Sequence, residues 1–138
     1  VIAREMGITL DEEKESDHIS YTHLVALTYQ TDQEKRKFAG TVFGNSQVRI
    51  VQIDDYHMEV QPEGYLLLYK NVDKPGMLAK VGSELALANI NIAGVALGRD
   101  KPGQKALTVM NVDSQIPGKI LTKLEQIEGV FEVRTAKI

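Results

Sequence analysis

The sequence predicts an α+β protein in two parts, an antiparallel strand-rich unit over residues 1–63 and a β-α-β-β-α-β unit over residues 64–138. Short strand-like stretches joined by polar turns fill the first part, whereas the second alternates short apolar runs with helical periodicity. The charge also changes along the chain. Residues 1–64 hold 6 basic and 12 acidic side chains, and residues 65–138 hold 10 basic and 7 acidic ones, so the balance of charge reverses and indicates two units.

The first part is expected to be a sheet of four consecutive strands. A short helix-like opening at residues 1–6 and an acidic run at 11–17, too polar to pack in a core, precede it. Polar turns at 31–34, 44–46 and 54–55 separate segments that are rich in β-branched, aromatic and alternating residues. These segments predict antiparallel strands at residues 21–29, 35–43, 48–53 and 56–60.

The second part begins after residues 62–64 and combines strands with two amphipathic helices. Apolar residues spaced three or four apart predict one helix from Pro75 to residue 88, ended by Asn89, and another over 117–127, ended by Gly129. Short apolar or alternating runs predict strands at residues 65–69, 91–97, 105–112 and 130–136. The apolar face of the first helix consists of Leu78, Val81, Leu85 and Ala88.

The resulting β-α-β-β-α-β order is ferredoxin-like. Two right-handed crossovers place both helices on one face of a four-stranded antiparallel sheet. The opposite face is then expected to meet water or a partner. Because this topology hosts many functions, the function has to be argued from a site.

Composition excludes several classes of protein. The chain has no cysteine, which rules out disulfides, thiolate zinc or iron–sulfur sites and a cysteine nucleophile. We find no nucleophile with a base, no metal cluster and no glycine-rich cofactor loop, so catalytic residues, metal and cofactor are all predicted to be absent from this segment. Scattered basic residues argue against nucleic acid, and the absence of a long apolar run or signal peptide argues for a cytoplasmic protein without membrane contact. The opening at Val1 suggests a piece of a longer protein.

The candidate site is the loop 71–76 together with 89–91, where the first predicted helix returns to the next strand. Unpaired amides at a helix start suit a carboxylate, and Gly76 leaves room for its close approach. Asp73 suits an ammonium group, and the amides of Asn71 and Asn91 both donate and accept. These are the groups that an amino-acid ligand needs. The alternative is that Asp73 only caps the helix and that Asn89 and Asn91 only mark its end.

A family resemblance favours the binding interpretation. The runs Asp73-Lys74-Pro75-Gly76-Met77-Leu78 and Asn89-Ile90-Asn91-Ile92-Ala93-Gly94 resemble the ACT-domain signature, and the likeness spans residues 65–138. The resemblance implies a regulatory domain that pairs with a second copy. Its effector-binding residues are expected to be Asn71, Asp73, Pro75, Gly76, Met77, Leu78, Asn91 and Ile92.

The first part resembles a particular companion of ACT domains. Residues 39–44 (AGTVFG), 49–54 (RIVQID) and 1–8 (VIAREMGI) are similar to the intervening domain of D-3-phosphoglycerate dehydrogenases. This resemblance implies the C-terminal regulatory portion of an NAD-dependent enzyme of serine biosynthesis, assembled as a homodimer or homotetramer. L-serine is then the expected feedback effector, and Asn71, Asp73 and Asn91 match the serine contacts. The family often has His or Tyr at the position of Asn71.

A second site is implied by longer members of the family, which bind an anion on the intervening domain. Arg49 and His57 match basic positions of that kind, whereas Gln61 replaces a basic residue. The alternative is that Arg49 and His57 are ordinary exposed strand residues. His18 and His23 lack metal-ligand spacing, and Asp54-Asp55 reads as a hairpin turn.

Three hypotheses remain open at the level of sequence. The chain is a serine-binding regulatory module of the dehydrogenase, a module that only holds an oligomer together, or the regulatory portion of an iron–sulfur L-serine dehydratase. Catalytic domains of the same chain are the other expected partner. Sequence upstream of Val1 discriminates the dehydrogenase from the dehydratase.

Overall fold

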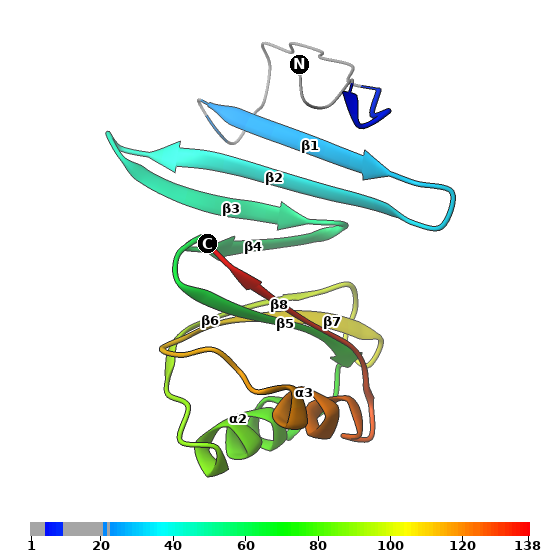
Figure 1. The fold of residues 1–138 in the computed structure, drawn as a ribbon, viewed down its shortest axis with the longest axis vertical. Helices are drawn as coiled ribbons and strands as arrows, with labels where there is room; N and C mark the ends of the chain where they lie inside the picture. Colours follow the sequence, from blue (N-terminus) through cyan, green and yellow to red (C-terminus); the bar gives the residue numbers. More distant parts are fainter. Residues whose placement is uncertain (1–4, 10–20, 22) are drawn as a thin grey trace.

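The computed structural model describes residues 5–9, 21 and 23–138, and Figure 1 shows how their elements are arranged. The acidic run at 11–17 and most of the helix predicted at 1–6 lie outside the described residues. None of the described helices is long and apolar enough to cross a membrane.

The first part is an antiparallel meander, as predicted. Its strands are paired in the order β1-β2-β3-β4. The hairpin between β1 and β2 is closed by Thr31, whose Oγ1 accepts the N–H groups of Gln33 (3.2 Å) and Glu34 (3.0 Å). The first strand starts later than predicted, so Tyr21 is not part of it. The four strands are β1 (Leu24–Gln30), β2 (Lys35–Phe43), β3 (Gln47–Ile53) and β4 (Tyr56–Val60).

The second part has the predicted β-α-β-β-α-β order, which confirms the α+β, ferredoxin-like prediction. Its strands are paired in the order β6-β7-β5-β8, all antiparallel. Both helices lie on one side of this sheet (Figure 1). The elements are β5 (Tyr65–Val72), α2 (Met77–Leu87), β6 (Ile92–Arg99), β7 (Lys105–Val112), α3 (Gly118–Glu125) and β8 (Val130–Lys137).

The start of α2 differs from the prediction. Gly76 has φ +86°, which is incompatible with a helix interior, so the helix begins at Met77 and Pro75 belongs to a turn. Leu78 is 45% exposed, and Met77 takes its place in the core beside Val81 and Leu85. The predicted apolar face was therefore wrong at Leu78.

The end of α2 confirms the predicted role of Asn89. Asn89 adopts φ +57°, a left-handed conformation that asparagine tolerates better than most residues. Its N–H donates to the carbonyl of Ala86 (2.9 Å), and the N–H of Ile90 donates to the carbonyl of Leu85 (2.9 Å). This pair of bonds is the Schellman closure, which satisfies carbonyls that a helix end leaves unpaired.

The sheet of the second part is buried on both faces. Leu67 and Tyr69 of β5 point toward the helices, and their cluster includes Val81, Leu85, Leu124 and Met110. On the opposite face Leu66 and Leu68 pack against the first sheet. The face expected to meet water or a partner is thus covered by the chain's own β3 and β4. The second cluster consists of Ile53, Met58, Val60, Leu66, Leu107 and Val109.

The two sheets approach most closely where β4 crosses β6. Gly98 is buried there, and a Cβ atom at this position would lie 2.8 Å from both Tyr56 Cβ and Met58 Cε. It would also lie 3.3 Å from the carbonyl oxygen of His57. The absence of a side chain at Gly98 therefore sets how closely the sheets pack.

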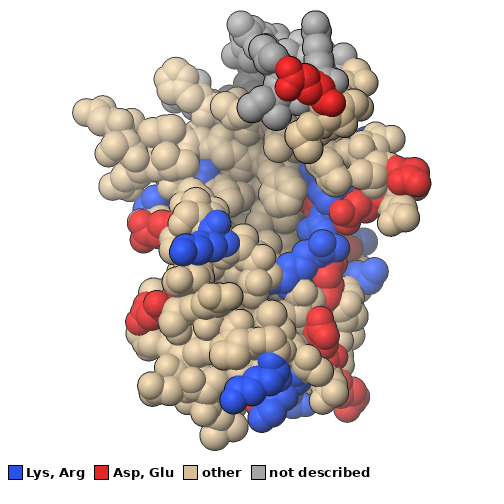
Figure 2. All heavy atoms as spheres, viewed as in Figure 1, with Lys and Arg blue, Asp and Glu red and all other residues tan. Residues whose placement is uncertain are grey.

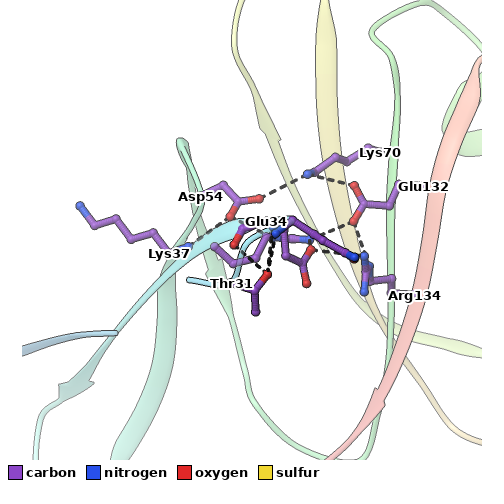
Figure 3. Close-up of polar contacts among 9 residues, drawn as sticks. Thr31, Glu34, Lys37, Asp54, Lys70, Glu132 and Arg134 are labelled. Atoms are coloured by element: carbon purple, nitrogen blue, oxygen red, sulfur yellow. Dashed lines mark hydrogen bonds and ion pairs between the residues drawn. The ribbon is translucent and has the colours of Figure 1, made fainter. Parts of the chain in front are cut away.

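A ring of four alternating charges joins the two sheets, and we call Arg36, Asp54, Lys70 and Glu132 the charge ring. Figure 3 labels three of its members, Asp54, Lys70 and Glu132. Arg36 contacts Asp54 (3.0 Å) and Glu132 (3.0 Å), and Lys70 contacts Asp54 (3.3 Å) and Glu132 (3.0 Å). Two of the four links, Arg36 to Glu132 and Lys70 to Asp54, connect the first sheet to the second. All four side chains are largely buried, between 14% and 26% exposed.

The charge ring predicts a stability that depends on pH. Burial by itself raises the pKa of Glu132, but hydrogen bonds from Lys70, Arg36 and Arg134 outweigh it and hold the pKa below its ordinary value. A carboxylate with a depressed native pKa stabilises the fold above its unfolded-state pKa and loses this contribution as the pH falls through the native pKa. Urea unfolding between pH 7 and pH 3 should therefore show a smaller loss of stability in Glu132→Gln than in the wild type. Parallel pH profiles would contradict the expectation.

Candidate functional site

Asn71, near the end of β5, carries a buried and incompletely bonded side chain. It is 4% exposed and lies on the same face of β5 as Leu67 and Tyr69, toward the helices. Its Nδ2 donates to the carbonyl of Val72 (2.7 Å), whereas its Oδ1 accepts no hydrogen bond from any described residue. Since buried polar atoms are normally paired, this oxygen is an acceptor that the described residues leave unsatisfied.

Asp73 follows in the loop between β5 and α2 and is held by the hairpin between β6 and β7. Its backbone N–H donates to the carbonyl of Gln104 (2.9 Å), and its Oδ2 accepts the N–H of Gly103 (3.4 Å). Arg99 Nη1 lies 3.5 Å from the same oxygen. Asp73 does not cap α2, because the N-cap is Gly76 and no side chain bonds to the first helical amides. The simple capping alternative for Asp73 is therefore wrong.

The start of α2 offers free amides to an anion. Pro75 and Gly76 are exposed, and Leu78 is exposed in the first turn, whereas the side chain of Met77 is buried in the core. No acidic residue lies in that turn. The uncapped N–H groups and the helix dipole there favour a carboxylate.

Asn91 and Ile92 lie at the other end of the sheet. Ile92 pairs through Val112 with Tyr65 at the start of β5, whereas Asn71 lies near the end of that strand. The six residue-to-residue steps from Tyr65 to Asn71 correspond to about 20 Å of extended strand. Asn91 is exposed, and its Nδ2 donates to Asp113 Oδ2 (2.8 Å). A single copy of the chain therefore does not bring Asn91 to the loop that carries Asp73.

The strand β6 forms a free edge of the sheet and carries exposed apolar side chains. In the part of the chain that the structure describes, β6 pairs only with β7. Val95 is 49% exposed and Leu97 is 48% exposed, and both point to the helix side, because they lie opposite Met110 and Thr108. An unpaired edge with apolar side chains is suited to pairing with another strand.

Comparison with known families agrees with this geometry. Residues 65–129 match the ACT domain, which covers β5 through the end of α3 and includes every candidate effector residue. The second half of the chain is an ACT domain. Residues 1–54 match the D-3-phosphoglycerate dehydrogenase intervening domain, and this match includes β1, β2 and β3 of the first sheet.

Individual relatives of this chain are named D-3-phosphoglycerate dehydrogenase. A D-3-phosphoglycerate dehydrogenase of Archaeoglobus fulgidus is 34% identical over 133 residues, which cover 95% of this chain and 25% of the relative. One of Methanocaldococcus jannaschii is 29% identical over 133 residues, 96% of this chain and 25% of the relative. One of Synechocystis is 27% identical over 136 residues, which cover 99% of this chain and 24% of the relative. The chain thus spans about a quarter of the length of the curated relatives it matches.

Sequence reasoning missed Arg99 in the ACT domain. The stretch 98–103 lies between the predicted strands 91–97 and 105–112 and carries no predicted site residue, yet it supplies Arg99 and Gly103 to the carboxylate of Asp73. The pairing of Arg99 with Ala106, which lies opposite Asn71, places the arginine beside the loop. This proximity depends on strand register across three strands, and no local motif in the sequence reports it.

The two residues of the possible anion site lie apart on the first sheet. Arg49 lines a cleft of about 480 Å³ formed with Ser46, Gln47, Val48, Gln61, Pro62 and Glu63. Its Nη1 donates to the carbonyl of Val48 (2.8 Å). His57 is exposed opposite Gln52 and does not line that cleft. The cleft that Arg49 lines therefore does not include His57.

Proposed function

We propose that the ACT domain binds an amino acid, L-serine, as a feedback effector at the seam between two copies of the chain. In this proposal the chain is the regulatory portion of a cytoplasmic D-3-phosphoglycerate dehydrogenase of serine biosynthesis. The intervening-domain match and the names of the relatives favour this parent over an L-serine dehydratase. The match at residues 65–129 supports a regulatory role for the binding site.

The observation that carries the proposal is the buried Asn71 Oδ1 without a partner. A buried polar atom without a hydrogen bond costs about 1–3 kcal/mol. A ligand ammonium that donates to this oxygen and to Asp73 would remove that cost. The uncapped amides at the start of α2 would donate hydrogen bonds to the ligand's carboxylate, since unpaired helical N–H groups and the helix dipole bind anions. The loop thus offers complementary groups to both charges of a zwitterion.

The second copy supplies Asn91. If two β6 strands pair antiparallel around Val95, residue 91 of one copy lies opposite residue 99 of the other. Arg99 contacts Asp73, so this pairing brings Asn91 of the second copy to the loop of the first copy. Within one copy, Asn91 lies about 20 Å from that loop. Val95 and Leu97 are then covered at the centre of the seam. The effector joins two subunits and shifts their arrangement by its differential affinity, about 1–3 kcal/mol in ordinary allosteric coupling.

The catalytic chemistry and NAD belong to a part of the parent enzyme outside this segment. The sequence contains no Gly-x-Gly-x-x-Gly run, and the loop 71–76, which joins β5 to α2, has one glycine where a dinucleotide fold has three. The residues of this segment therefore do not fit NAD, and we derive no catalytic step from them.

Isothermal titration with L-serine tests the proposal. We expect binding by the wild-type dimer, and a loss of at least about tenfold in affinity in Asp73→Asn, because removing a charged partner costs about 1.5–3 kcal/mol. Asp100→Asn is the matched control, since Asp100 is an exposed aspartate in the adjacent hairpin. D-serine is the control ligand. If a folded dimer gives no heat with L-serine, the serine-binding proposal is wrong, and the alternative of a module that only holds an oligomer together is favoured.

A further inference from the structure

Two members of the charge ring, Lys70 and Glu132, pair with each other in the ACT sheet. Their register row lies next to the effector loop, by which we mean residues 71–76. One row across the four strands consists of Gly98, Leu107, Lys70 and Glu132. The next row toward the loop consists of Arg99, Ala106, Asn71 and Val130. Every member of the first row contacts the first sheet or belongs to the cluster shared with it. The second row contains the candidate effector residue and the arginine that pairs with Asp73.

Consecutive residues of β5 connect these two rows. Lys70 points toward the first sheet and Asn71 toward the helices, because successive side chains of a strand lie on opposite faces. The pairing of β5 with β8 is irregular between these two residues, where Lys70 lies opposite Glu132 and Asn71 opposite Val130. A ligand that repositions Asn71 therefore acts on the strand segment that holds Lys70.

The two kinds of contact between the sheets play different parts. The apolar cluster around Leu107 favours contact but fixes no orientation, since hydrophobic attraction is non-directional. The links from Arg36 to Glu132 and from Lys70 to Asp54 are hydrogen-bonded ion pairs that require a particular geometry. Breaking one such link leaves a largely buried charge with fewer partners, which is costly. The ring therefore sets the orientation of the first sheet at the end nearest the loop.

We propose that the charge ring is the element that couples the effector loop of the ACT domain to the first sheet. A change at the loop alters the ring and with it the first sheet, and by reciprocity a change in the first sheet alters the loop. Only the ligand-dependent arm of the test rests on the proposed function. The ring is a two-way mechanical connection whether or not serine is the effector.

Hydrogen exchange of the ligand-free chain tests this coupling in both directions. Asp54→Asn alters the ring from the first sheet, and asparagine tolerates the left-handed φ of +53° at this position. We expect exchange of the Val72 and Asp73 amides, which bond to Gly129 and Gln104, to rise about tenfold because their local opening becomes easier. Lys70→Met alters the ring from the ACT sheet and should raise exchange of the Asp54 amide, which bonds to the carbonyl of Lys37.

A matched control separates the ring from ordinary surface charge. Lys123→Met removes the ion pair of the exposed Lys123 with Glu84 between α3 and α2, and it should change exchange at neither location. If each ring variant loosens only its own sheet, the coupling proposal is wrong. If Asp54→Asn does not fold, Lys70→Met decides alone through exchange at Asp54.

Saturating L-serine extends the test to the bound state. In the wild type, serine should slow exchange of the Asp54 amide, and in Lys70→Met this effect should disappear while the heat of binding persists. Persistence of the slowed exchange in Lys70→Met would overturn the proposal. Absence of any serine heat would overturn the proposed function instead, and the ligand-free experiment would still decide the role of the ring.

Discussion

Replacing Gly98 with alanine is expected to lower the free energy of unfolding by about 1–3 kcal/mol, the usual cost of overpacking a close contact. The added Cβ would lie 2.8 Å from Tyr56 Cβ, and no rotamer change of Tyr56 moves its own Cβ away. The carbonyl of His57 at 3.3 Å blocks a second direction. The two sheets must therefore separate at their closest crossing.

Gly82→Ala is the matched control for this substitution. Gly82 lies inside α2, and a Cβ atom there meets only Ile92 Cδ1 at 3.9 Å, an ordinary contact. The same chemical change should raise the free energy of unfolding by about 0.5–1 kcal/mol, since alanine is the better helix former. Urea denaturation followed by circular dichroism measures both values. Equal effects of the two substitutions would contradict the packing described for Gly98.

The order of elements was predictable because local patterns determine it. Thr31 and the residues after it close a hairpin through their own side chains and amides, and Asn89 stops α2 through a left-handed turn. The exact start of α2 was not predictable, because Pro75 and Gly76 also suit a turn before a helix. The positive φ of Gly76 selects the turn, and spacing in the sequence does not report φ.

The contact between the sheets was beyond sequence reasoning. The apolar run 65–69 predicts a buried strand, yet it does not say what covers the face away from the helices. Arg36, Asp54, Lys70 and Glu132 are separated by up to 96 positions and meet only after two sheets have formed and stacked. Figure 2 shows Lys and Arg side chains beside Asp and Glu on the face in view, and composition alone does not distinguish such surface charges from the largely buried ring.

The candidate site was predicted in its residues and not in its arrangement. Asn71 lies near the end of β5, and Asp73 and Gly76 lie in the loop that follows it. Asn91 does not join them in one copy, because right-handed β-α-β topology places the start of β6 at the end of the sheet opposite to the loop. The proposed site therefore needs a second copy, which the resemblance to ACT domains implies, whereas no local sequence pattern specifies how the two copies meet.

Asn91→Ala is expected to weaken L-serine binding by about 10- to 100-fold, the effect of losing a hydrogen bond to a charged ligand group. This loss is expected although Asn91 lies about 20 Å from the loop of its own chain. Stability should change little because Asn91 is exposed. Asn45→Ala, in an exposed turn of the first sheet, is the control and should bind as the wild type does. Calorimetric titration measures the three affinities.

The shared site is tested most directly by a heterodimer of Asp73→Asn and Asn91→Ala chains, co-expressed with different affinity tags and purified through both. Each homodimer carries one altered residue in both sites, whereas the heterodimer has one doubly altered site and one intact site. Titration should show affinity weakened by at least about tenfold in either homodimer. The heterodimer should bind L-serine with wild-type affinity and about half the wild-type stoichiometry. A heterodimer that gives no heat, or an Asn91→Ala homodimer that binds as the wild type does, would contradict a site built from two copies.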